Sequence, residues 1–402
     1  MTESYLDAIK NVKQSLASFC KFISANDVGR TGGHQSGYYV SKDAAKALFN
    51  CDCIKGTLED RWFQITWPDG YVTTSRFVYY GQKSRDESRI TNFGRGFEFM
   101  KDDYIGSLLI ISKHSEESYT ASVLSQEEDI NEFIIQYNIP LDTKCFLFIN
   151  DREEVKQQII NPNDKLNGLL LEIVSRYNDF PETTMMSKFA RDCYNAAFCL
   201  NDTRISEKPD SVLGSWLDTE TSLFYLLEDK IYKPVYSTPF NSVADFTKAA
   251  NEVLNRRKSR AGKSLEHHLA QIFTSSKLKF EEQCITEDNK KPDFIFPGGE
   301  EYHSLVFPCD DLVFLGAKTT CKDRWRQVLN EADKIETKYL FTLQPGISSN
   351  QLKEMSHENL HLVVPHDNIK LFAKEHQGDL IDLKQFIDFV HSKQDKYHFF
   401  VI

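Results

Sequence analysis

The chain has 402 residues, a length that predicts two domains because single hydrophobic cores rarely grow beyond about 250–300 residues. It is 41% hydrophobic and 27% charged, and no run approaches the ~18 apolar residues of a membrane helix, which excludes a membrane partner. Nine cysteines without a Cys-x-x-Cys pair, together with an N-terminus that does not resemble a secretion signal, predict reduced thiols and a cytoplasmic protein. The net charge of -11 argues against nucleic acid on average, but residues 256–263 carry five basic side chains and no acidic one. Such a run is most often a solvated surface, but several basic runs in this chain coincide with Gly-rich or strand-end positions, which weakens that interpretation.

The first ~165 residues are predicted to be mainly β-structure, because short apolar or alternating runs are separated by turn signals. The expected strands are 62–66, 71–80, 107–112 and 144–149. This rhythm indicates a small barrel-like sheet with one or two helices, and the polar segment 161–168 is a candidate domain boundary.

The remainder alternates between helical and strand patterns. Helices are expected at 183–199, at 241–255 and again from 264, with a polar loop at 201–210. Strands are expected at 293–296, 312–318, 339–344 and 361–365, with helices at 322–336 and 382–393. This alternation predicts a mixed, partly parallel sheet flanked by helices.

Acidic and basic side chains lie at the ends of two of these predicted strands. Asp293 begins one strand and Lys318 closes the next, so the fold could bring them side by side, while Glu331 lies inside the predicted helix. Carboxylates bind Mg²⁺, which activates a bound water, and a lysine can orient that water and shield a charged phosphate. The alternative is structural: Asp293 caps a turn, Glu331 pairs with Lys334, and no metal is held.

Three charged residues follow Lys318 and are expected on the first turn of the predicted helix. Lysine and arginine donate to guanine, and aspartate accepts from cytosine, so Lys322, Asp323 and Arg324 suit adjacent G·C pairs in the major groove. An exposed helix N-terminus of mixed charge is the plain alternative. Trp325 is tempting as a base-stacking residue, although a helix tryptophan more often belongs to the core.

Long blocks of the sequence resemble the EcoRII-type restriction endonucleases, a type IIE branch of the PD-(D/E)XK nuclease superfamily. The blocks are SANDVGRTGGHQSGYYV (24–40), SRITNFGRG (88–96), NRRKSRAGKSLE (255–266), ITEDNKKPDFIFP (285–297) and KTTCKDRWRQVLNEADKI (318–335). The resemblance implies a mixed fold: an N-terminal β-rich pseudobarrel that binds effector DNA (1–168) and a C-terminal α/β nuclease domain with a central mixed sheet (169–402), joined near 161–182.

The resemblance also implies roles for individual residues. Asp293, Lys318, Glu331 and Glu266 would be catalytic, with Asp293 and Glu331 binding Mg²⁺. Gly316 stands where the common superfamily pattern has an acid. The EcoRII branch departs from that pattern in a similar way, and it therefore directs attention to Glu331 as the second acid. DNA contacts in the catalytic domain would come from Lys322, Asp323, Arg324, Arg256, Arg257 and Arg260. Those in the effector domain would come from His34, Tyr39, Lys83, Arg85, Glu87, Arg89 and Arg95.

Relatives in this branch cut double-stranded DNA at CC(A/T)GG or close variants, and bind a second copy of the target as an allosteric effector that relieves autoinhibition. The resemblance therefore implies a homodimer through the catalytic domain and a restriction-modification system with a cognate DNA methyltransferase, not necessarily in contact. Two other functions stay open: a sequence-specific DNA-binding regulator that keeps the nuclease fold without cleavage, and a mismatch-nicking repair nuclease. The carboxylates argue against the regulator, and the two base-reading clusters against the repair enzyme.

Overall fold

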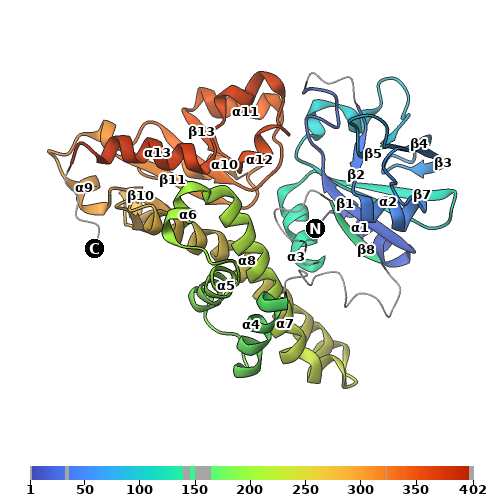
Figure 1. The fold of residues 1–402 in the computed structure, drawn as a ribbon, viewed down its shortest axis with the longest axis horizontal. Coiled ribbons are helices and arrows are strands. Elements are labelled where there is room, and N and C mark those ends of the chain that lie inside the picture. Colours follow the sequence, from blue (N-terminus) through green and yellow to red (C-terminus); the bar gives the residue numbers. More distant parts are fainter. Residues whose placement is uncertain are drawn as a thin grey trace.

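The structure, a computed structural model, describes residues 2–31, 36–137, 139, 145–149, 164–322 and 324–397. They form an N-terminal unit and a C-terminal unit, each built on one sheet (Figure 1). The mixed fold class predicted from the sequence is confirmed. Among the described residues, no helix combines the length and the apolar character needed to cross a membrane.

The N-terminal unit is a curled eight-stranded sheet in the order β2-β5-β4-β3-β7-β6-β1-β8. Its strands are β1 Ala17–Phe22, β2 Tyr38–Val40, β3 Leu58–Thr66, β4 Val72–Tyr80, β5 Glu87–Thr91, β6 Leu108–Lys113, β7 Ser118–Leu124 and β8 Phe146–Ile149. Helix α2 (Lys42–Phe49) packs into the core on one face of the sheet. Helices α1 (Glu3–Gln14) and α3 (Glu127–Tyr137) cover the other face. Strand alternation explains this division, because successive side chains point to opposite faces.

The C-terminal unit contains a five-stranded sheet in the order β13-β12-β11-β10-β9. Its strands are β9 Glu281–Glu282, β10 Phe294–Phe296, β11 Val313–Lys318, β12 Lys338–Thr342 and β13 Leu360–Val363. Strand β10 is antiparallel to β9 and β11, whereas β11, β12 and β13 run parallel. The predicted mixed, partly parallel sheet is therefore confirmed.

The helices of the C-terminal unit cover both faces of this sheet or pack beside it. They are α4 Asp164–Arg176, α5 Thr183–Phe198, α6 Asp202–Glu207, α7 Pro209–Tyr236, α8 Val243–Ser275, α9 Gly299–His303, α10 Trp325–Leu329, α11 Ser349–His357, α12 His366–Ile369 and α13 Leu383–Gln394. Apolar side chains of α7, α8 and α13 pack on one face. Those of α9, α10 and α11 pack on the other, where Trp325 is a core residue. Helix α3 of the N-terminal unit lies beside α8 (Figure 1).

The predicted helix over 322–336 is wrong, because only α10, Trp325–Leu329, is helical. Beyond it, side chains from elsewhere take the backbone amides that a longer helix would use. The amide of Asp333 donates to Glu287, and the amide of Lys334 donates to the Tyr302 hydroxyl. Glu331 therefore lies after the helix rather than inside it.

Two other expectations along the chain are also corrected. Residues 256–263 do not interrupt the helical pattern, since α8 runs unbroken from Val243 to Ser275; arginine, lysine and alanine are good helix formers. The predicted loop at 201–210 contains α6 and the start of α7. Helix α4 spans the predicted boundary at residue 168 and packs against α5 and α7, so it belongs to the C-terminal unit by its contacts. The domain limits themselves stay a prediction.

Replacing Phe273 with alanine should lower the free energy of unfolding by about 3–5 kcal/mol. The buried ring lies on α8 and meets the rings of Phe294 and Phe296 edge-on, so its loss leaves a cavity against the sheet. Chemical denaturation followed by circular dichroism measures the change. Phe246→Ala on the same helix is the control, because this ring is 55% exposed and should cost less than about 1 kcal/mol. Equal losses in both variants would contradict this packing.

Candidate active site

Asp293 and Lys318 lie together at one edge of the C-terminal sheet. The antiparallel pairing of β10 and β11 sets Phe294 opposite Leu315, so the start of β10 meets the end of β11. One oxygen of the Asp293 carboxylate, Oδ2, accepts from the Ala317 amide at 2.8 Å and from the Lys318 ammonium at 3.0 Å. Gln283 donates its side-chain amide to Oδ1 at 3.2 Å. Three hydrogen-bond donors thus hold the buried carboxylate in place.

Glu331 lies in the electrostatic field of this pair. Its side chain is half-buried, and Oε2 has no hydrogen-bond partner among the described residues. Burial, and then the negative charge of Asp293, raise the pKa of Glu331 to about 7, while the charges of Lys318, Lys338 and Lys290 oppose the shift. The alternative pairing with Lys334 is absent, because that ammonium donates to the carbonyls of Tyr302 at 2.7 Å and Ser304 at 3.4 Å.

Gly316 explains why the second acid comes from outside the strand. Residues 314, 316 and 318 share one face of β11, the face that α10 covers. A Cβ at Gly316 would lie 3.1 Å from Cγ1 of Val328 on α10, so an acid at this position would require Val328 to shift. The chain instead leaves α10 and brings Glu331 to the same edge of the sheet.

Glu266 approaches the site from α8. Burial, followed by the charge of Asp293, raises the pKa of Glu266, whereas Lys263 and Lys318 lower it. Lys263 donates to the Glu266 carboxylate at 3.1 Å. The four residues predicted to be catalytic are therefore electrostatically coupled around one sheet edge.

The donor set fits a hard divalent cation. Asp293 and Glu331 offer carboxylate oxygens, and the buried Oε2 of Glu331 lacks the donor that burial normally requires. Mg²⁺ is typically bound by one or two carboxylates and completes its octahedron with water and phosphate oxygens. Within the described ranges, no three His, Cys, Asp or Glu side chains converge as a complete metal site.

The predicted base-reading residues face the N-terminal unit. Lys322 is 7% exposed and donates to the Ser107 hydroxyl at 2.9 Å, and the backbone amide of Arg324 donates to Glu127 at 2.9 Å. Thr320 donates to Asn131 at 2.8 Å. Asp323 lies outside the described residues. Helix α3, which carries Glu127 and Asn131, thus covers the segment that follows Lys318.

The basic run of α8 makes specific contacts instead of forming a free surface. Arg257 donates to both carboxylate oxygens of Glu228, at 2.8 and 2.6 Å, and to the carbonyl of Gln136 at 2.7 Å. That carbonyl belongs to the last turn of α3, where a cation is favoured. The guanidinium groups of Arg256 and Arg260 lie 4.6 and 5.0 Å from the ring centroids of Phe180 and Phe224.

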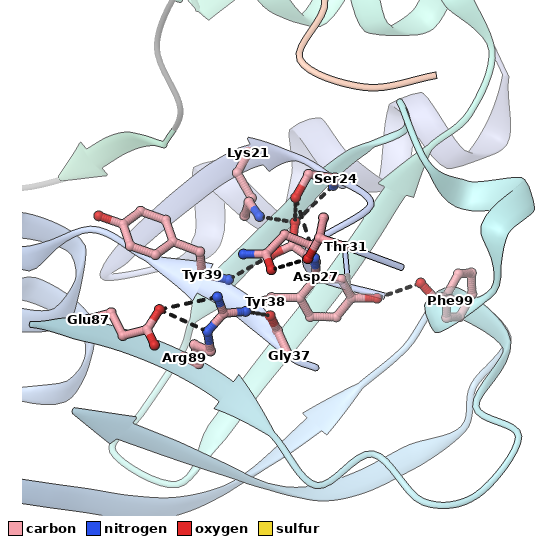
Figure 2. A network of polar contacts seen from close by, with 11 residues as sticks. Lys21, Ser24, Asp27, Thr31, Gly37, Tyr38, Tyr39, Glu87, Arg89 and Phe99 are labelled. Carbon is pink, nitrogen blue, oxygen red and sulfur yellow. Dashed lines mark hydrogen bonds and ion pairs between the residues drawn. The ribbon is translucent and has the colours of Figure 1, made fainter. Parts of the chain in front are cut away.

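A second polar cluster lies in the N-terminal unit, at the edge strand β2 and its neighbour β5. The register sets Tyr39 opposite Arg89. Arg89 is 3% exposed; it donates to Glu87 at 3.2 Å and to the carbonyl of Gly37 at 2.9 Å. The ring of Tyr39 and the side chain of Glu87 extend to the same side (Figure 2). Gly37 has a φ of +133° and an absent Cβ that would lie 2.6 Å from the Ile90 carbonyl, so only glycine fits there.

Asp27 holds this cluster to the rest of the sheet, and sequence reasoning missed it (Figure 2). Its buried carboxylate accepts from the backbone amide of Tyr39 at 2.9 Å, from Ser24 and from the ammonium of Lys21. No spacing rule signals an acid that bonds across 12 residues to a strand amide.

The remaining predicted effector contacts that the structure describes are exposed. Lys83, Arg85 and Arg95 are exposed, and the Arg85 guanidinium lies 5.6 Å from the centroid of the Tyr80 ring. His34 lies outside the described residues.

Comparison with known proteins identifies two matching families. The family described as "EcoRII C terminal" matches residues 224–387, and "Restriction endonuclease EcoRII, N-terminal" matches residues 12–145. The chain is 34% identical over 385 residues to the type II restriction enzyme EcoRII of Escherichia coli, covering 92% of both chains. It is 25% identical over 168 residues to the type II restriction enzyme SsoII of Shigella sonnei, covering 37% of this chain and 53% of that one.

Two solved structures also align with the chain. Metal-depleted Ecl18kI in complex with uncleaved, modified DNA gives a TM-score of 0.46 at 18% identity, over 58% of this chain and 87% of that one. The complex of restriction endonuclease PspGI with substrate DNA gives 0.44 at 13% identity, over 54% and 95%.

In metal-free protein, Glu331 should make stability fall as the pH rises from about 4.5 to about 7. The folded state raises the pKa of this carboxyl above its ordinary 4.5, so the folded chain holds the proton more tightly than the unfolded chain does. Above pH 7, the free energy of unfolding of Glu331→Gln should therefore be about 1–2 kcal/mol larger than that of the wild type. This value allows for solvent screening, because the carboxyl group is partly exposed. Denaturant unfolding in a chelator at pH 5 and pH 8 measures this. The exposed Glu336→Gln is the control, and a Glu331→Gln variant less stable than the wild type at pH 8 would refute the assignment.

Proposed function

The chain belongs to the EcoRII family of type II restriction enzymes, and we propose that it hydrolyses double-stranded DNA at a CC(A/T)GG-like site with Mg²⁺. The observation that carries this proposal is the coupling of Asp293, Lys318 and Glu331 at one sheet edge, with an unpartnered buried oxygen on Glu331. Two acids aimed at one place repel each other, which costs stability unless a cation joins them. A DNA-binding regulator without cleavage would gain nothing from that cost.

Each residue of the site has a distinct role in this proposal. Asp293 and Glu331 hold the cation, and Glu266 adds negative charge beside them. An Mg²⁺ ion bound there would lower the pKa of a water and offset charge on the scissile phosphate. Lys318 keeps its ammonium 3.0 Å from Asp293, where it can orient the attacking water and stabilise the negative charge that develops on phosphate.

Sequence recognition by the catalytic unit is assigned to Lys322, Asp323 and Arg324. Two cationic donors flanking an acceptor match neighbouring G·C pairs in the major groove. Recognition of both halves of a near-palindrome requires a two-fold assembly, so we assign a homodimer through this unit. Arg256, Arg257 and Arg260 are proposed as backbone contacts that become available once their present partners move. A cognate DNA methyltransferase would protect the same site.

The N-terminal unit is proposed to bind a second copy of the target as effector. Tyr39, Glu87 and Arg89 lie together on one sheet edge, which supports a shared reading surface. Because Arg89 donates internally to Glu87, it is suited to aim that carboxylate at a cytosine amino group. The other predicted contacts in this unit are His34, Lys83, Arg85 and Arg95.

Autoinhibition by the N-terminal unit forms part of this proposal. Helix α3 accepts hydrogen bonds from Thr320 and from the Arg324 amide, and Lys322 is buried against Ser107. DNA could not reach the ammonium of Lys322 while Ser107 and its surroundings cover it, and the partly exposed guanidinium of Arg324 is drawn towards Glu127 at 3.6 Å. Effector binding would favour a state in which α3 has moved, which couples the two sites through one equilibrium.

Asp293→Ala should bind DNA carrying CC(A/T)GG and leave it uncut. The substitution removes one cation ligand and the partner of Lys318, but none of the proposed base readers. Plasmids with one or with several sites, digested with Mg²⁺ and sequenced at their ends, give the cleavage position, and gel shifts give the binding. The wild type should cut multi-site plasmids faster than single-site ones.

Cleavage by Asp293→Ala at the wild-type rate would refute the assigned site. Specific binding by the wild type without any cleavage would instead support the regulator. Equal rates on single-site and multi-site plasmids would remove the effector role while leaving the nuclease assignment intact.

Glu127→Ala should raise the rate of single-site cleavage by about tenfold, which corresponds to ~1.4 kcal/mol. Glu127 is 2% exposed and accepts from both the Thr320 hydroxyl and the Arg324 amide, so its loss weakens the closed arrangement. Initial rates on a one-site duplex measure the effect. Glu128→Ala removes the same charge from the exposed face of α3 and should change little. A similar gain in both variants would indicate a general charge effect and contradict specific inhibition.

A further inference from the structure

The turn that carries Glu331 is held together by a residue outside it. After α10 the chain reverses at Ala332, whose φ of +53° lies in the left-handed region, and Ile335 donates its amide back to the Ala332 carbonyl at 3.0 Å. Such a conformation costs a non-glycine residue free energy and persists only where the surroundings impose it. Ala332 and Ile335 are both buried, so their carbonyls depend on protein donors.

Lys338 supplies those donors. This first residue of β12 is 5% exposed, and its ammonium donates to the carbonyls of Ala332 at 3.2 Å and Ile335 at 2.7 Å. The ammonium also lies 5.6 Å from the centroid of the Phe314 ring, on the neighbouring strand β11. One lysine therefore connects the sheet that ends in Lys318 to the turn that presents Glu331.

Burying a lysine ammonium is energetically unfavourable, because the group loses its hydration and its new contacts must compensate for that loss. The carbonyls of Ala332 and Ile335 and the ring of Phe314 provide those contacts here. Burial lowers the pKa of Lys338, and the negative charges of Asp333 and Glu331 oppose that shift.

We propose that Lys338 is a positioning residue for the metal-binding acid: it fixes the turn at 332–335, which directly follows Glu331, to the sheet. The inference rests on the proposed function, since it assumes that Glu331 and Asp293 share a divalent cation. This role would act through the turn and not through a contact with the cation or with DNA. Its effect is expected on cation affinity, because groups that orient metal ligands typically contribute 10–100-fold to that affinity.

The test compares cation binding in full-length variants. Lys338→Met removes the donors and the charge while keeping an unbranched chain, and Lys338→Arg restores both. Lys334→Met is the matched control, because Lys334 lies in the same segment and also donates to two carbonyls, those of Tyr302 and Ser304, away from Glu331. Binding of Mn²⁺ alone, without DNA, is followed by the loss of the free-ion signal in electron paramagnetic resonance. Near-ultraviolet circular dichroism checks the fold.

Lys338→Met should bind Mn²⁺ about tenfold more weakly, whereas Lys338→Arg and Lys334→Met should stay close to the wild type. The Mg²⁺ concentration for half-maximal cleavage should rise in parallel, with unchanged metal-free DNA binding. If Lys338→Met does not fold, Lys338→Gln, which keeps a donor without the charge, serves in the same comparison. Unchanged Mn²⁺ affinity in the Lys338 variant, or an equal loss in Lys334→Met, would overturn the inference.

Asp293→Ala separates this inference from the proposal on which it depends. If that variant binds Mn²⁺ as tightly as the wild type, the assigned cation site is wrong, and the role of Lys338 falls with it. If Asp293→Ala loses the cation but Lys338→Met does not, only the positioning role fails.

Discussion

The carboxylate of Asp293 is the contact on which the site depends. It accepts from a backbone amide of β11 and from the Lys318 ammonium, so the same group that would bind a cation also ties the start of β10 to the end of β11. Antiparallel pairing is what makes this possible, because it brings a strand start and a strand end to one edge. The placement of Asp293 and Lys318 is therefore a property of the sheet.

The second acid follows from a packing constraint. Val328 lies close above Gly316, so a side chain at this position would have to displace it. The chain solves this by ending α10 early and returning Glu331 to the sheet edge. The early ending is enforced from outside, by Glu287 and Tyr302, which accept the amides of the following turn. Lys338 satisfies the carbonyls of the same turn. The turn after α10, in which Ala332 has a positive φ, is thus imposed by groups outside it.

Helix α3 connects the two units by contacting both the segment that follows Lys318 and the basic run of α8. Its first residue, Glu127, bonds to the segment that follows Lys318, and its last turn accepts from Arg257 of α8. Lys322 and Arg257, which sequence reasoning assigned to DNA, are in this state satisfied by protein. That exchange of partners is chemically reasonable, because phosphate, carboxylate and backbone carbonyl oxygens are all acceptors for the same cationic donors.

The sequence by itself determined the two-unit mixed fold, the strands that carry Asp293 and Lys318, and the acidic and basic residue types of the site, because alternation and strand-end chemistry are local signals. It failed where distant groups override local preference. Residues 330–336 look helical but are not, and the run at 256–263 looks like a free basic surface but is engaged. Asp27, Glu127 and Lys338 carried no signal, since each acts through backbone groups or residues remote in sequence. Only the tertiary structure decided these points, because a hydrogen-bond partner for a buried group is chosen by proximity in space and not by spacing along the chain.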